Sequence, residues 1–253
     1  MTSDQTNPMK TLKGRSKIQY IWDYYKLPLI ILGILLYLFG YCLYRYLSYK
    51  ETILYTALVN VTVGENLTQA LTNNFLLSQN LNPDKNKLEL YTGLYLTENE
   101  QNIDHQYTYA SRIKILAAID AERFDMVLMN QEAFDAFSQN GYLYNLEMFL
   151  LQTDPALYET VKSNLVSNLF ILEDNSIERQ LDASLPYQAI TEEHYYGIDL
   201  SDTKLIQNAG FEEPVYLGII ANSPRTDTVI AYLNYLLSPT VSQDQSLPDQ
   251  MLE

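Results

Sequence analysis

The longest hydrophobic pattern in the chain is an unbroken run of uncharged, mostly apolar residues over positions 27–44. As an α-helix, these 18 residues would span roughly 27 Å, close to the thickness of a bilayer's hydrocarbon core. A helix of that length buried in a soluble domain normally has one polar face, and this run has none. The pattern therefore predicts a transmembrane helix over residues 27–47, followed by a separate domain.

From residue 52 onward, short runs rich in β-branched residues alternate with helical patterns. Strands are predicted at 52–61, 87–96 and 124–129, with helices after them at about 64–82, 107–122 and 131–138. In the second helix, Ile113, Leu116 and Ala117 are expected to form the inner stripe. This strict alternation predicts an α/β fold with a mostly parallel sheet and helices on both of its faces.

The second half of the domain is less regular. Leu157, Val161, Leu165 and Leu169 are spaced four apart and predict a helix over 155–170, whereas residues 173–200 favour a hairpin or irregular structure. A strand is predicted at 214–222. Ser223-Pro224 then combines an N-cap with proline at the first helical position, which predicts a helix ending near Leu237. The acidic tail 240–253 is predicted to be disordered.

Charge is distributed unevenly around the apolar run. Residues 1–49 hold six basic and two acidic side chains, and residues 50–253 hold ten and 29, so the net charge of −15 divides into +4 and −19. Basic residues favour the cytoplasmic side of a membrane, so the asymmetry predicts residues 1–26 in the cytoplasm and residues 50–239 outside the cell. Aromatic side chains flank both ends of the run, which suits the two headgroup regions.

A cleaved signal peptide and a lipoprotein signal are the alternatives for this run. A signal peptide has a shorter apolar region and small residues before its cleavage site, and residues 45–50 contain no such pattern. Cys42 is the only cysteine, and it follows Tyr41, where a lipid-attachment signal needs a small residue. An uncleaved single-pass anchor, with the lipid bilayer as the partner of residues 27–47, is therefore the favoured interpretation.

Composition also narrows the chemistry of the exported part. Without a second cysteine it forms no intrachain disulfide, so apolar burial has to hold the fold. The negative charge argues against nucleic acid as a partner. Hydrolase, metalloprotease and P-loop motifs are absent, and Glu192-Glu193-His194 is interpreted as an exposed acidic segment. The sequence therefore predicts no enzyme activity, no cofactor and no metal.

Residues 112–147 resemble bacterial extracellular solute-binding proteins. In that family a helix with small residues leads to a short strand, here Phe124–Met129, and the next helix is followed by a Gly-x-Leu-x-Asn-Leu turn, here 141–146. Residues 216–239 resemble the returning strand and helix. The resemblance implies a type 2 periplasmic-binding arrangement in a membrane-anchored protein of the bacterial cell envelope, with one late antiparallel strand beside strand 124–129. Its second lobe would be reduced to an insertion at about 150–213.

Ligands of open α/β sheets lie beyond the carboxyl ends of the strands. The polar residues that follow the predicted strands are Asn60, Thr62, Glu65, Asn130, Gln131, Asn222 and Ser223. Asn130 and Ser223 have an alternative role as helix caps. Asn60, Asn130 and Asn222 are expected to meet at one edge of the sheet.

These observations predict a membrane-tethered, solute-binding-like module on the outer face of the membrane. It would present a small solute to a permease or engage another envelope protein. The alternative is a structural or regulatory ectodomain that has lost ligand binding. A deep pocket lined by the three asparagines favours solute binding, and a filled strand-end surface favours the alternative.

Overall fold

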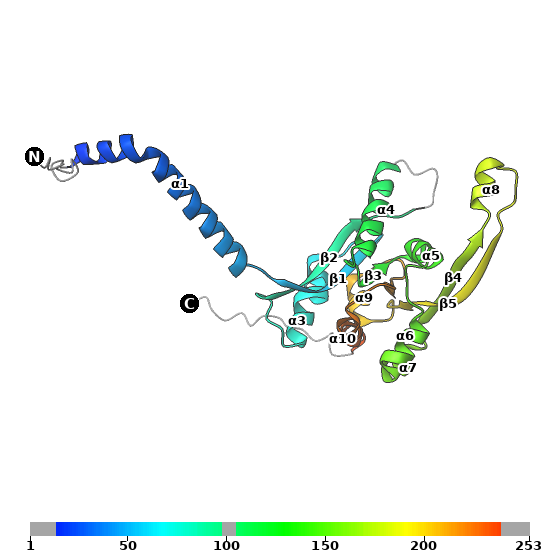
Figure 1. Cartoon of the computed structure of the whole chain (residues 1–253). Helices are drawn as coiled ribbons and strands as arrows, with labels where there is room; N and C mark the ends of the chain where they lie inside the picture. Colours follow the sequence, from blue (N-terminus) through cyan, green and yellow to red (C-terminus); the bar gives the residue numbers. More distant parts are fainter. Residues whose placement is uncertain (1–13, 98–104, 239–253) are drawn as a thin grey trace, which may run out of the picture. The chain divides into compact units, whose positions relative to one another are not determined.

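The computed structural model describes residues 14–97 and 105–238, and the chain divides into two compact units, residues 1–49 and 50–253. The first unit contains one long helix, α1 (Arg15–Leu47). Its segment Tyr25–Leu47 has a mean hydropathy of 2.2 and is not buried, so it is long and apolar enough to cross a membrane. Pro28 lies inside α1, and Figure 1 shows that this helix bends.

The second unit is built on one six-stranded sheet with the strand order β2-β1-β3-β6-β5-β4 (Figure 1). The strands are β1 (Glu51–Val59), β2 (Asn86–Leu94), β3 (Met126–Met129), β4 (Leu165–Asp174), β5 (Ala189–Asp199) and β6 (Tyr216–Ile219). β1 pairs in parallel with β2 and β3, whereas the β3–β6, β6–β5 and β5–β4 pairings are antiparallel. The sheet is therefore mixed, and the prediction of a mostly parallel sheet with one antiparallel strand is wrong for its second half.

Helices cover both faces of this sheet, as the alternating pattern predicts. They are α2 (Glu65–Gln69), η2 (Ala70–Asn74), α3 (Phe75–Ser78), α4 (His105–Asp120), α5 (Gln131–Gln139), α6 (Leu146–Thr153), α7 (Pro155–Val161), α9 (Lys204–Ala209) and α10 (Thr226–Leu237). The remaining helix of this unit, α8 (Ser176–Leu181), lies between β4 and β5 and has no buried residue. β3 separates two hydrophobic clusters, because successive side chains of a strand point to opposite faces. Met126 and Leu128 join the cluster formed with α10, and Val127 and Met129 join the cluster formed with α4 and α5.

The helical segment after β1 contains a π-helical turn, η2, between α2 and α3. Two tyrosines of α10 bind its backbone: the hydroxyl of Tyr232 donates to the carbonyl of Leu71 (2.8 Å), and that of Tyr235 donates to the carbonyl of Ala70 (2.6 Å). Tyr232 also packs edge-on against Phe75, with ring centroids 4.8 Å apart. These contacts fix α10 against the helix that follows β1.

The region expected to form a reduced second lobe instead extends the main sheet. The predicted helix 155–170 is correct only to Val161, because β4 begins at Leu165. A spacing of four residues fits both one turn of a helix and two repeats of a strand, so the positions of Leu165 and Leu169 do not distinguish a helix from a strand. β4 and β5 form a long antiparallel hairpin with α8 at its tip, in place of a separate lobe.

Two further predictions need correction. The buried side chains of α4 are Ser111, Ile115, Ala118 and Ile119, whereas the three predicted residues, Ile113, Leu116 and Ala117, are exposed. Apolar residues occur around most of that helix, so the periodicity did not define one face. α10 begins at Thr226, so Pro224 is not its first residue. The tail 240–253 lies outside the described residues.

Candidate functional site

Asn60 and Asn130 meet at the carboxyl edge of the parallel strands, as the sequence predicts. Asn60 follows β1 directly and has a φ of 58°, in the left-handed region that asparagine tolerates better than most residues. Asn130 follows β3 and is the N-cap of α5, where its Oδ1 accepts from the backbone N–H of Ala133 (3.1 Å). The Nδ2 of Asn60 donates to the same Oδ1 (3.0 Å). The hydrogen bond between these two side chains therefore links the carboxyl end of β1 to the carboxyl end of β3.

The remaining amide groups of these two side chains are also used within the protein. Asn60 donates to the carbonyl of Leu96 (2.7 Å) and accepts from the N–H of Leu96 (2.8 Å), which binds the segment after β2. The Nδ2 of Asn130 donates to Glu213 Oε2 (3.3 Å). A ligand at this edge would have to displace these hydrogen bonds, whose donors and acceptors are already satisfied.

The other predicted residues of this edge, Thr62, Glu65 and Gln131, are all exposed. Thr62 and Glu65 are exposed, and Glu65 lies in the first turn of α2, where a carboxylate favours the positive end of the helix. Gln131 is exposed, and its Nε2 donates to Asp135 of the same helix (2.8 Å). These side chains therefore act within or beside their own helices.

Asn222 and Ser223 lie at the opposite edge of the sheet. β6 runs antiparallel to β3, so its carboxyl end lies beside the start of β3. The Nδ2 of Asn222 donates to the carbonyl of Ile119 (2.7 Å). The hydroxyl of Ser223 donates to Asp125 (2.6 Å) and does not cap α10. The expectation that Asn222 meets Asn60 and Asn130 is therefore wrong.

At this second edge lies a buried polar cluster around Asp125 that the sequence analysis did not single out. Asp125 has no exposed surface, and its carboxylate accepts from the N–H of Tyr55 (2.8 Å), Ser223 Oγ and Arg225 Nη1 (3.0 Å). The Arg225 guanidinium also lies 4.6 Å from the centroid of the Tyr55 ring. The Asp125 carboxylate, directly before β3, thus links β3 to β1 and to residues 223–225, which precede α10. An acid directly before a buried apolar strand was the signal available in the sequence.

In β5, the Nε2 atom of His194 lies 3.2 Å from the Oε2 atom of Glu192, and the side chain of Glu192 is exposed. Among residues 14–97 and 105–238, no group of three or more His, Cys, Asp or Glu side chains is arranged to hold a metal ion. The pair is therefore a partly exposed contact on the hairpin, in line with the interpretation of an exposed acidic segment.

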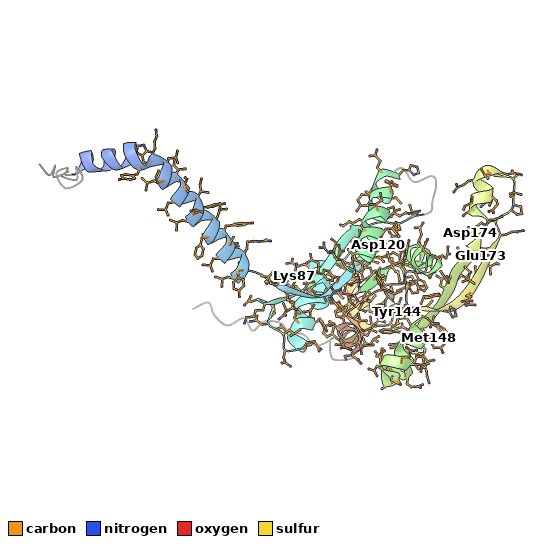
Figure 2. All side chains as sticks on the ribbon, viewed as in Figure 1. Lys87, Asp120, Tyr144, Met148, Glu173 and Asp174 are labelled. Carbon is orange, nitrogen blue, oxygen red and sulfur yellow. The ribbon has the colours of Figure 1, made fainter. Side chains whose placement is uncertain are left out.

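The β4–β5 hairpin, residues 165–199, forms an arm whose outer part borders a groove of about 660 Å³. The groove is lined by Gln139 and Asn140 at the end of α5, by residues 170–174 of β4, and by Arg179 and Tyr187. Figure 2 shows Glu173 and Asp174 at the outer end of β4. Hydrogen bonds from the Ser176 side chain and backbone lower the pKa of Asp174. This part of the arm therefore stays acidic.

One face of the arm is covered near its base and the other is open. Asn168 Nδ2 donates to Asp135 of α5 (2.7 Å), and the Phe170 ring lies so close to Gly141 that a Cβ there would come within 2.7 Å of it. Gly141 also has a φ of 70°, so this turn requires glycine on both grounds. Leu169, on the alternate face, is 42% exposed.

Comparison with known proteins found no matching family model, no matching curated protein and no matching solved structure. The resemblance to solute-binding proteins therefore stays a prediction.

Proposed function

We propose that the chain is a single-pass membrane protein whose acidic domain, residues 50–253, lies outside the cell and engages another envelope protein. The apolar segment Tyr25–Leu47 and the charge asymmetry around it support the anchored topology. The proposal keeps the envelope partner of the leading prediction and combines it with the alternative, a structural or regulatory ectodomain that has lost ligand binding.

The observation that carries this choice is the hydrogen bonding of Asn60 and Asn130. A solute site at the strand ends needs polar groups that are free to bind the ligand. Here the side-chain amides of Asn60 and Asn130 are hydrogen-bonded to each other. Asn60 also binds the backbone of Leu96 after β2, and Asn130 binds the N–H of Ala133 at the start of α5. The third predicted asparagine, Asn222, lies at the other edge of the sheet. The geometry therefore favours a structural role for this edge.

Presentation of a solute to a permease is the competing function, and the family resemblance favours it. A thermal-shift screen of the purified full-length chain in detergent, against sugars, amino acids, peptides and ions, separates the two. A ligand that binds only the folded state raises the unfolding temperature by mass action. We expect no compound in the screen to do so.

Matched asparagine variants locate any ligand that is found. Asn60→Ala/Asn130→Ala removes the strand-end amides, and Asn222→Ala removes the same side chain at the opposite edge. A compound that stabilises the parent and Asn222→Ala, but not the double variant, would establish a strand-end solute site and overturn the proposal.

A further inference from the structure

The outer part of the arm is a two-stranded ribbon without a third strand. β4 is the last strand of the sheet and, among the described strands, pairs only with β5. β5 pairs with β6 only at Ile198 and Asp199, so its residues 189–195 have β4 as their single neighbour. Isolated two-stranded ribbons are marginally stable in water, and unpaired strand edges accept further strands.

This ribbon also exposes large apolar side chains. On its strands Leu169 is 42% exposed, Leu172 46% and Ile190 59%. At the tip, Ile177 and Leu181 are 71% and 87% exposed, and α8 has no buried residue. Apolar side chains gathered on one projecting element indicate an interaction surface, since monomeric proteins rarely leave large patches of this kind open.

The net charge of the arm indicates which kind of partner it can bind. Residues 165–199 contain seven acidic side chains and one basic side chain, Arg179. Arg179 is engaged by its own hairpin, since its Nε donates to the carbonyl of Leu185 (3.1 Å) and its guanidinium lies 5.7 Å from the Tyr187 ring centroid. The excess negative charge opposes pairing with a second copy of the arm and opposes anionic lipid headgroups.

We propose that the arm binds an extended cationic segment of a partner protein, which adds as a strand along the free edge of β4. Apolar residues of that segment would contact Leu169 and Leu172, and its Lys or Arg residues would face the carboxylates of Glu173, Glu192 and Glu193. Strand addition obtains affinity from main-chain hydrogen bonds and specificity from alternate side chains. The inference rests on the proposed function and names its binding surface.

Photo-crosslinking with the full-length chain in its membrane tests this assignment. A benzophenone amino acid replaces Leu172 in the groove or, as the control, Tyr109 of α4, which is 68% exposed and lies outside the arm. The crosslinked peptide is then identified by mass spectrometry. We expect an adduct from position 172 only, on a segment of another protein that has net positive charge and contains apolar residues.

Charge reversal supplies the second readout. Glu192→Lys/Glu193→Lys should lower the adduct yield several-fold, and so should raised salt. Asp84→Lys/Asp202→Lys makes the same change in net charge at exposed positions outside the arm and should leave the yield unchanged. Equal unfolding midpoints of the variants exclude loss of the fold as the cause.

An adduct with a second copy, with lipid or with a neutral or acidic segment would overturn the inference, as would no adduct from position 172. A protein adduct from position 109 alone would remove the arm assignment and leave the proposed function standing. Failure of the proposed function would give a different result: a solute that stabilises the parent chain but does not stabilise Asn60→Ala/Asn130→Ala.

Discussion

Replacing Asp125 with alanine should destabilise the domain of residues 50–253 more than the replacement of any exposed carboxylate. The side chain is fully buried and accepts three hydrogen bonds, one of them from the Arg225 guanidinium. Each of these three hydrogen bonds has the ionised carboxylate as its acceptor, and hydrogen bonds to charged groups contribute about 1.5–3 kcal/mol each. Contributions within one hydrogen-bond network are not additive, and removing one partner of a buried ion pair costs about 3–5 kcal/mol in total. We therefore expect a loss of about 3–5 kcal/mol in the free energy of unfolding.

Urea unfolding followed by circular dichroism measures this loss. Tryptophan fluorescence is unsuitable, because the single tryptophan, Trp22, lies in α1. The urea midpoint should fall with an unchanged m-value, since the surface exposed on unfolding stays the same. Asp202→Ala is the matched control at an exposed carboxylate and should stay within about 0.5 kcal/mol of the parent.

A double-mutant cycle assigns the effect to the ion pair. Arg225→Ala leaves the Asp125 carboxylate buried without its cation, so it should also be costly, and the double variant should cost less than the two single changes together. An Asp125→Ala domain within about 0.5 kcal/mol of the parent would refute the reasoning that this cluster fastens β1, β3 and α10.

Three further predictions follow from the core and the anchor. Val127→Asp places a carboxylate at a fully buried position in the centre of the sheet and should unfold the domain, whereas a soluble mutant with cooperative unfolding would contradict this packing. Burial raises the pKa of Tyr232 and raises that of Tyr235 to about 12, so stability should be complete below pH 10, where both states are protonated, and should fall between pH 10 and 12. In Tyr232→Phe/Tyr235→Phe, urea midpoints measured across that range should fall less steeply. Protease added to intact cells should remove residues 50–253, and protection of this domain would contradict the proposed orientation.

The first half of the fold could be predicted because its strands are short segments rich in β-branched, aliphatic and aromatic residues that alternate along the chain with helical patterns. The Asn60–Asn130 contact follows from the same logic, since carboxyl ends of neighbouring parallel strands meet at one edge. Asn130 also caps α5, as its position before that helix predicts.

The second half depends on pairings between distant residues, which local patterns do not encode. Leu165 and Leu169 fit a helix and a strand equally well, so the hairpin was predicted only from residue 173. The direction of β6 decides at which edge Asn222 lies, and the resemblance had already implied an antiparallel strand there. Local sequence patterns do not predict the role of Asp125, because its three partners come from two distant segments, around residue 55 and around residues 223–225.

The short ladder between β5 and β6 has a mechanical consequence. Tension between the membrane anchor and a protein held on the arm would enter through β1, which begins at Glu51, soon after α1 ends at Leu47. β1 is supported on both sides, with seven paired positions to β2 and four to β3. The load then crosses β6 and reaches β5 through two paired positions, the fewest of any strand pair in the sheet. Under a pulling force the sheet would therefore yield first between β6 and β5, while β1 stays paired with β2 and β3 and the arm keeps the contact of Asn168 with α5.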